Sequence, residues 1–463
     1  MRWLDTALLR PRAILSRCDT HQPRLLTQSG VEPPHSKGAD EFSSRETRKN
    51  LMTGPSAEAF RSEIEAKSFQ SSTFATEAVD ALIRASVGVR ASDVHLQPTS
   101  GGFEIRWRVD GVLHPVTVLP NEVAPKIVAR LKVLAELLTY KTEIPQEGRI
   151  RNGQADAEMR LSTFPTLFGE KAVLRFFSSS GNLQRLDDLG LPAEIQAGLR
   201  RLLNATSGAI LFSGPAGSGK TTTIYACLRE LVATTEGRRS LVTLEDPIEV
   251  PVAGVAQSQV NPGTGFSLDL GLRSLLRQDP EVIAVGEIRD RETAEVAFQA
   301  SLTGHLVLST FHAASASAVV GRLSDMGIEP YLLRSGLLAV IGQRLVRRLC
   351  ECSQKSDDVR QKHGLNVTQF RIPIGCEKCS KTGYFGRLVL AEMLEPEPTE
   401  LGRAILSRTE ISRLETLAIE AGMISLWQRA RTAVEAGLTS PAEVTRVLGL
   451  APKAFFDDSP HEA

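Results

Sequence analysis

Four short, almost unbroken apolar runs in the second half of the chain most constrain its fold. They are Ala209 to Phe212, Leu241 to Leu244, Val282 to Val285 and Leu306 to Leu308. Runs of this kind are typical of strands buried on both faces, as in a parallel sheet covered by helices on either side. Helical patterns separate the runs, for example at 220–232. The alternation predicts an α/β domain with a parallel sheet.

A polar or charged segment follows the carboxyl end of each run. The four segments are Gly214 to Thr221, Glu245-Asp246-Pro247, Gly286-Glu287 and Ser309 to His312. Ligands of open α/β sheets bind just beyond the carboxyl ends of the strands. We therefore expect the four segments to meet in one crevice; otherwise each would be a separate accident of sequence.

The first segment fits the phosphate-binding pattern G-x-x-x-x-G-K-[ST]. Its glycines let backbone N–H groups point at phosphate oxygens, helped by the N-terminus of the following helix. Lys220 is expected to reach the β- and γ-phosphates of ATP, and the Thr221 hydroxyl to bind Mg²⁺. The predicted nucleotide-binding residues are Gly214, Pro215, Ala216, Gly217, Ser218, Gly219, Lys220, Thr221 and Thr222.

The other segments supply candidate catalytic side chains. Glu287 ends a strand where such proteins place a water- or metal-directing acid, although Gly286 occupies the usual Asp position. Glu287 is a candidate base, and its alternative is a solvated acid at a strand end. Glu245 and its neighbour Asp246 could hold Mg²⁺ through water, and His312 is a candidate sensor of the γ-phosphate.

The first half of the chain has a different pattern. Apolar residues alternate strictly with polar ones over 103–109, which predicts a half-buried strand, and Asp110-Gly111 then predicts a hairpin turn. A short helix is expected at 76–87. We assign 73–180 to a small α/β domain with an antiparallel sheet, and 181–198 to a linker.

The N-terminal residues 1–72 are predicted to be a disordered tail, as are residues 456–463. Residues 1–30 hold five arginines and two aspartates. A start rich in arginine and poor in acids also fits a mitochondrial transit peptide, or a start codon placed too early. No apolar stretch of about 7–15 residues follows the early arginines, which argues against a secretory signal.

Composition excludes several classes of protein. Lysine plus arginine and aspartate plus glutamate are both 54, and zero net charge argues against a general polycation on nucleic acid. No apolar run approaches the ~18–20 residues that span a bilayer. Six cysteines in 463 residues are too sparse for a disulfide scaffold and fit a reducing compartment.

Four of the cysteines cluster within thirty residues. Cys376 and Cys379 have the spacing of a zinc knuckle, and Cys350 and Cys352 form a shorter C-x-C pair. Two thiolate pairs joined by a loop suit tetrahedral Zn²⁺ in a structural role. The alternative is a set of reduced thiols in a small loop domain.

The ordered motifs over about 90–450 together resemble the secretion ATPases of the type II secretion and type IV pilus superfamily, of the GspE, PulE and PilB type. The matching segments are Ala91-Ser-Asp-Val-His95, Arg108-Val-Asp-Gly111, Pro145-Gln-Glu-Gly-Arg149, Arg160-Leu-Ser-Thr163, Gly214 to Thr221, Leu244 to Glu249, Leu276 to Pro280, Val285 to Asp290 and Thr303 to His312.

The resemblance implies a homo-hexameric motor in which a PAS-like N-terminal domain is joined to a RecA-like ATPase domain, here 199–455. That domain would include a metal-binding subdomain at 347–386 and a C-terminal helical part at 387–455. ATP would bind between the two domains. Arginines of the family's nucleotide site correspond to Arg160, Arg175, Arg273 and Arg277. They would neutralise charge on the departing phosphoryl group.

The resemblance also implies a cytoplasmic location at the inner membrane, reached through partner proteins. The expected partner is a polytopic platform protein of the GspF or PilC type. Docking on a bitopic GspL-type protein is not expected, because residues 1–72 contain too little apolar material for a docking domain.

The expected function is ATP hydrolysis that powers pseudopilus assembly and protein export by type II secretion, with type IV pilus extension as the alternative. The cysteine insertion favours assembly, because the family's retraction ATPases lack it. A nucleic-acid motor is a further alternative, opposed by neutral charge and 5% aromatic content. A regulator that binds ATP without turnover is opposed by the complete set of catalytic candidates.

Overall fold

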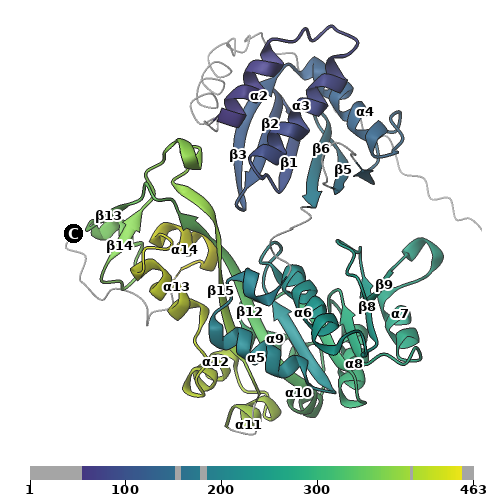
Figure 1. Cartoon of the computed structure of the whole chain (residues 1–463), viewed down its shortest axis with the longest axis vertical. Coiled ribbons are helices and arrows are strands. Elements are labelled where there is room, and N and C mark those ends of the chain that lie inside the picture. Colours follow the sequence, from purple (N-terminus) through teal and green to yellow (C-terminus); the bar gives the residue numbers. More distant parts are fainter. Residues whose placement is uncertain (1–54, 152–157, 178–184, 397–399, 451–463) are drawn as a thin grey trace, which may run out of the picture.

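Two large sheets organise the chain (Figure 1), and β13 (Gln354–Ser356) pairs with β14 (Phe370–Ile372) in a small third sheet. The computed structural model describes residues 55–151, 158–177, 185–396 and 400–450. We call 55–177 the N-terminal domain and 185–450 the C-terminal domain. The fold class expected from the sequence, a parallel-sheet α/β domain preceded by a smaller α/β domain, is confirmed. No helix among these described residues is long and apolar enough to cross a membrane.

The N-terminal domain is an antiparallel sheet with helices on one face. Its six strands have the order β3-β2-β1-β6-β5-β4. The strands are β1 (Asp93–Thr99), β2 (Gly102–Val109), β3 (Val112–Leu119), β4 (Gln146–Arg151), β5 (Glu158–Thr166) and β6 (Gly169–Phe177). The helices are α2 (Pro55–Glu65), α3 (Phe74–Gly88) and α4 (Ala124–Leu134), with a 3₁₀ turn, η1 (Asn121–Val123), before α4.

The alternation of apolar and polar residues at 103–109 places one face of β2 in the core of this domain. Phe103, Ile105 and Trp107 are at most 1% exposed and pack beneath the helices, whereas the polar residues between them lie on the opposite face. Asp110 and Gly111 have φ of 48° and 82°, the left-handed pair of a two-residue hairpin turn between β2 and β3. The predicted strand and hairpin are confirmed.

The expectation of a disordered tail up to residue 72 is wrong from residue 55 onward. Helix α2 buries Ala57, Phe60 and Ile64 in the core of the N-terminal domain. These three residues have helical spacing. They are the main contribution of this described segment to the core, and the residues around them are largely charged, so the amphipathic pattern of the helix is weak in the sequence. Residues 1–54 and 456–463 lie outside the described residues.

The C-terminal domain contains a seven-stranded sheet of order β15-β12-β7-β11-β10-β8-β9. All neighbours are parallel except β12 and β15. The strands are β7 (Gly208–Ser213), β8 (Leu241–Glu245), β9 (Ala256–Gln259), β10 (Val282–Val285), β11 (Leu306–Phe311), β12 (Leu337–Leu349) and β15 (Tyr384–Leu394). Every residue of β7, β8, β10 and β11 is buried, as the four apolar runs predicted.

Helices cover both faces of this sheet. One face packs against α5 (Ala193–Leu203) and α6 (Lys220–Thr235). The other packs against α7 (Leu268–Leu275), α8 (Arg291–Leu302), α9 (Ala316–Asp325), α10 (Pro330–Gly336), α11 (Glu400–Leu406) and α12 (Ile411–Glu420). Two further helices, α13 (Leu426–Glu435) and α14 (Pro441–Leu448), pack against the far end of β12 and β15.

Two predicted boundaries of this domain are wrong. The expected linker 181–198 includes the 3₁₀ turn η2 (Leu186–Leu189) and the start of α5, whose Leu186 and Ile195 are buried in the core. The helical part expected from 387 begins later, because 384–394 form β15. In both places charged residues next to the buried ones hide the apolar pattern in the sequence. Residues 181–184 lie outside the described residues.

Candidate nucleotide site and cysteine cluster

The predicted phosphate-binding loop joins β7 to α6, at the carboxyl end of the sheet. Gly214, Gly217 and Gly219 all have positive φ, a conformation that side chains disfavour. A Cβ on Gly214 would lie 2.5 Å from Gln343 O and 2.5 Å from Ser218 Oγ. The loop therefore requires glycine at this position for space as well as for conformation. Helix α6 begins at Lys220, so its N-terminus faces the loop.

Lys220 is buried against the loop that it follows. Its ammonium group donates to Gly214 O at 2.8 Å and to Pro215 O at 3.0 Å. Burial lowers the pKa of Lys220 to about 8, and the nearby Glu287 carboxylate opposes this shift. A negatively charged ligand would hold the lysine in its charged form, since an opposite charge favours ionisation.

A cavity of about 670 Å³ separates this loop from the N-terminal domain. One side is lined by Ala216 through Thr223, which include most of the predicted nucleotide-binding residues. The side chains of Ser218 and Gln343 also line it, and Ser218 Oγ and Gln343 Oε1 have no hydrogen-bond partner among the described residues. Buried polar atoms are normally paired, so these two are unsatisfied hydrogen-bonding groups in the wall of the cavity.

The N-terminal domain lines the facing side of the cavity with Arg108 and Arg175. Arg387 of β15 joins them from the C-terminal domain. The structure thus brings Arg175, predicted from the sequence, next to the phosphate-binding loop. It adds Arg108 and Arg387, which the sequence reasoning did not select, because polar positions in alternating strands look like an ordinary solvated face.

The other predicted arginines have different surroundings. Arg160 pairs with Glu147 at 2.6 Å, and its charge acts on Glu249, a residue of the cavity wall. Arg273 lies in α7, and Arg277 donates to the Arg273 carbonyl at 3.1 Å. Neither Arg273 nor Arg277 lines the cavity within this chain.

Glu287 and His312 lie together, as expected from their positions after β10 and β11. His312 Nε2 is 3.2 Å from Glu287 Oε2, and Arg289 pairs with Glu287 Oε1. The Glu287 carboxylate also acts electrostatically on Lys220. These contacts place the acid and the histidine at the same sheet edge as the phosphate-binding loop.

Glu245 is fixed by neutral donors inside the fold. Its Oε1 accepts hydrogen bonds from the Thr243 hydroxyl at 2.6 Å and the Gln257 amide at 3.0 Å, and Tyr225 donates to Oε2. Glu245 does not line the cavity; Glu249, four residues later, does.

Glu249 is the acid that the sequence reasoning missed. Burial and the nearby Glu245 raise its pKa, whereas the charges of Arg175, Arg160 and Lys220 oppose the shift. A carboxyl group with a raised pKa, surrounded by cations in a cavity, is typical of a functional site. The sequence did offer one indication of its importance, because Glu249 and Glu245 belong to the same motif, Leu244 to Glu249.

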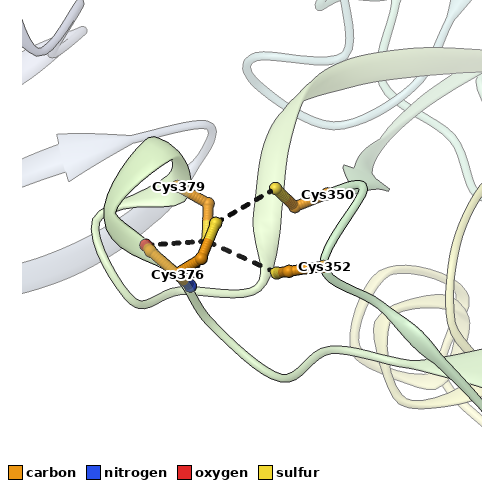
Figure 2. A group of neighbouring side chains, drawn as sticks. All are labelled: Cys350, Cys352, Cys376 and Cys379. Carbon is orange, nitrogen blue, oxygen red and sulfur yellow. Dashed lines mark hydrogen bonds between the residues drawn. The ribbon is translucent and has the colours of Figure 1, made fainter.

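The four clustered cysteines converge from two loops (Figure 2). Cys350 and Cys352 follow β12, whereas Cys376 and Cys379 lie at the 3₁₀ turn η5 (Glu377–Cys379), before β15. Sγ–Sγ distances are 3.8 Å for Cys350–Cys376, 3.9 Å for Cys352–Cys379 and 3.7 Å for Cys376–Cys379. A tetrahedron of thiolates around zinc, with Zn–S near 2.3 Å, has edges of about 3.8 Å. The three measured edges therefore match such a tetrahedron, and all four sulfur atoms lie within 4.8 Å of one another.

Backbone N–H groups lower the pKa of one of these thiols. Burial raises the pKa of Cys379, but N–H donors from Cys376 and Gly383, at 3.1 and 3.2 Å, outweigh it and bring the pKa to about 7. Burial raises the pKa of Cys350 to about 12. A metal ion would bind both as thiolates, and the four sulfur atoms fit zinc in both number and spacing.

The fold and the site define a nucleotide-binding α/β protein in which a second domain faces the phosphate-binding loop. The chain belongs to the family of type II/IV secretion system proteins, whose model matches residues 69–446. It is 40% identical over 378 residues to the type II secretion system ATPase E of Vibrio cholerae, covering 80% of this chain and 74% of that protein.

Two other comparisons extend this result to pilus motors. The chain is 36% identical over 377 residues to the type IV pilus assembly ATPase PilB of Thermus thermophilus, covering 79% of this chain and 42% of that protein. Among solved structures, the pilus retraction motor PilT with bound ADP aligns at a TM-score of 0.55 and 25% identity, covering 81% of this chain and 97% of PilT.

Proposed function

We propose that this protein is an ATP hydrolase that powers pseudopilus assembly and protein export by type II secretion. The observation that carries the proposal is the cavity in which Lys220 and Thr221 face Arg108 and Arg175 of the N-terminal domain. A phosphate-binding loop alone supports binding, whereas cations on the facing wall could neutralise the charge that develops on a departing phosphoryl group.

The triphosphate would lie on the loop, with Lys220 at the β- and γ-phosphates and backbone N–H groups around them. Thr221, which lines the cavity, would hold Mg²⁺ through its hydroxyl. The metal neutralises phosphate charge when bound. The adjoining Gly214, Pro215, Ala216, Gly217, Gly219 and Thr222 complete this predicted binding segment.

Glu249 and Glu287 would have different roles in hydrolysis. Glu249 lines the cavity, and its raised pKa suits a group that accepts a proton from water, so we assign it as the general base. Glu287 is paired with His312 and Arg289, and this group would report the state of the γ-phosphate through Lys220. Glu245 would keep the strand end in place through Tyr225, Thr243 and Gln257.

The arginines would act from two directions. Arg175 and Arg160 approach from the N-terminal domain of the same chain. Arg273 and Arg277 lie away from this cavity, so a role in hydrolysis requires that they reach the nucleotide of a neighbouring subunit. This is consistent with the proposed homo-hexamer, in which they would face an adjacent site.

The cysteine cluster would bind a structural Zn²⁺ through Cys350, Cys352, Cys376 and Cys379. Four protein ligands leave no open coordination position, which is the pattern of structural rather than catalytic zinc. We further propose that the protein acts in the cytoplasm and attaches to the inner membrane through a polytopic platform protein of the GspF or PilC type.

The function is tested by phosphate release from the purified protein with Mg²⁺ and ATP, with and without single-stranded DNA. We expect hydrolysis that DNA does not stimulate; absence of turnover would favour a nucleotide-gated regulator, and stimulation by DNA would favour a nucleic-acid motor. Gene deletion followed by a secretome comparison then distinguishes secretion from pilus extension. Pilus extension is the second candidate function because of the similarity to PilB. Loss of pili with an unchanged secretome would favour the pilus alternative.

A further inference from the structure

Four arginines and one aspartate form a row across five strands of the N-terminal sheet. The register pairs Arg108 with Asp93, Asp93 with Arg175, Arg175 with Arg160, and Arg160 with Arg149. Directly paired residues of antiparallel strands lie on the same face of a sheet. We call these five residues the arginine row.

The arginine row faces the C-terminal domain. Arg108, Asp93 and Arg175 line the cavity of the phosphate-binding loop. At the other end, Arg149 Nη2 donates to Ile248 O at 3.0 Å and to Gln259 Oε1 at 3.3 Å. Ile248 immediately precedes Glu249, so the row extends from the loop side of the cavity to the segment that carries the proposed base.

Such a row has an electrostatic cost. Like charges directly opposite one another in a sheet are destabilising, and two of the four adjacent pairs, Arg175 with Arg160 and Arg160 with Arg149, are arginine–arginine. Asp93 is the single acid of the row. Its carboxylate is 7% exposed and lies 2.9 Å from Arg175 Nε and 3.4 Å from Arg108 Nε. The Ser92 hydroxyl donates to its Oδ2 at 2.9 Å, which fixes its orientation.

We propose that Asp93 is a positioning residue that holds Arg108 and Arg175 toward the phosphates of the bound nucleotide. The inference rests on the proposed ATPase function. An arginine side chain has many rotamers, and Arg175 is 62% exposed, so few contacts other than the Asp93 carboxylate restrict it. Without the carboxylate between them, the two guanidinium groups would repel each other and point away from the position they must occupy during phosphoryl transfer.

The position of Asp93 separates this role from that of an ordinary surface ion pair. Glu104, on the same face of β2, pairs with Arg106, but neither residue lines the cavity. Glu104→Gln is therefore a matched control that removes a carboxylate from the same sheet face without touching the arginine row.

The test measures kcat, the KM for ATP and the melting temperature for Asp93→Asn, Glu104→Gln and wild type. Asn keeps the size of the side chain and removes its charge. We expect Asp93→Asn to lower kcat about tenfold or more, the effect of losing a charge-assisted hydrogen bond, with KM unchanged or lower because a negative charge has left the phosphate site. Glu104→Gln should behave as wild type.

The same substitution in a protein that lacks both arginines distinguishes a role in positioning these arginines from a general structural effect. If Asp93 acts through the two arginines, Asp93→Asn should change the rate less than about twofold in the Arg108→Ala Arg175→Ala protein, because coupled residues are non-additive. An undiminished effect in that background, or wild-type turnover of Asp93→Asn, would overturn the inference. Absence of hydrolysis by wild type would instead refute the proposed function, and this inference with it.

Discussion

The parallel sheet of the C-terminal domain presents its candidate site residues at strand ends, whereas the antiparallel sheet of the N-terminal domain presents them within its strands. Glu287 follows β10 and His312 follows β11, beside the loop after β7. Asp93, Arg108 and Arg175 lie in strands, with side chains on the face opposite the core. Glu287 and His312 do not line the cavity, but the loop after β7 does, so one cavity combines groups placed by two different rules of sheet geometry.

The two sites are therefore expected to contribute differently to binding and to turnover. In the proposed mechanism, the strand-end site would bind phosphate through backbone groups and a single lysine, and the strand-face site would add the charged side chains of Arg108 and Arg175. Substitutions in the first should therefore abolish nucleotide binding, whereas substitutions in the second should reduce turnover and leave binding largely intact.

The largest effect is expected at the strand-end site. Lys220→Ala removes the buried ammonium that follows the loop, so both ATP affinity and turnover should fall, lowering kcat/KM by about 10³-fold or more. Binding of a fluorescent ATP analogue and phosphate release measure the two effects. Analogue affinity equal to that of wild type would contradict the assignment of the loop.

The proposed base gives the next largest effect. Glu249→Gln should lower kcat about 10²-fold, the lower end of the range for general base catalysis, without weakening ATP binding. Burial and Glu245 raise the pKa of Glu249, and the base must be ionised. Wild-type kcat should therefore fall as the pH drops through a value above the usual glutamate range.

The pH profile of kcat, compared between wild type and Glu249→Gln, checks this assignment. The residual kcat of the Glu249→Gln variant should not show this fall at low pH. If Glu287→Gln removed the fall instead and Glu249→Gln kept it, the roles assigned to the two acids would have to be exchanged.

The cysteine cluster should matter for stability rather than for binding. Cys376→Ser removes one of four thiolates, and we expect bound zinc to be lost and the melting temperature to fall by about 4–8 °C, equivalent to ~2 kcal/mol. Elemental analysis and thermal unfolding measure these outcomes. Cys227→Ser is a control, because Cys227 is a buried thiol in a different part of the fold. Wild-type protein purified without stoichiometric zinc would exclude the metal site.

The smallest effect is expected where the two domains touch beside the cavity. Asp110, at the β2–β3 turn, accepts from the Gly386 N–H at 2.9 Å and lies 3.7 Å from Arg387 Nε. Asp110→Ala should raise the KM for ATP less than about fivefold, because a single hydrogen bond is worth about 1 kcal/mol. Asp358→Asn, which removes an exposed pair with Arg360, should leave KM unchanged. Equal KM in both variants would show that this contact does not influence the site.

The contrast between the two sheets also explains what the sequence could predict. The apolar runs, the glycine pattern and Glu287 with His312 were recognisable, because a parallel sheet brings strand ends together whatever the rest of the fold does. The role of Asp93 was not recognisable, because it depends on which strands are neighbours: β1 lies between β2 and β6 only in the folded sheet. Helix α2 was missed because only Ala57, Phe60 and Ile64 mark its buried face.

Glu249 shows a further limit of sequence reasoning. It lies in the same motif as Glu245, which is the last residue of β8, and it follows Glu245 by four residues. Only the fold shows that Glu245 is enclosed by Thr243, Gln257 and Tyr225, whereas Glu249 reaches the cavity. Such a difference depends on side-chain surroundings, which spacing along the chain does not encode.

In the proposed mechanism, the N-terminal domain supplies catalytic charge to a nucleotide bound by the C-terminal domain. Arg175→Ala tests it most directly, with ATP-analogue affinity and single-turnover hydrolysis measured on the same preparation. The account predicts affinity within a few-fold of wild type and hydrolysis slower by ~10³-fold, as for loss of an arginine finger. Hydrolysis at the wild-type rate would contradict it.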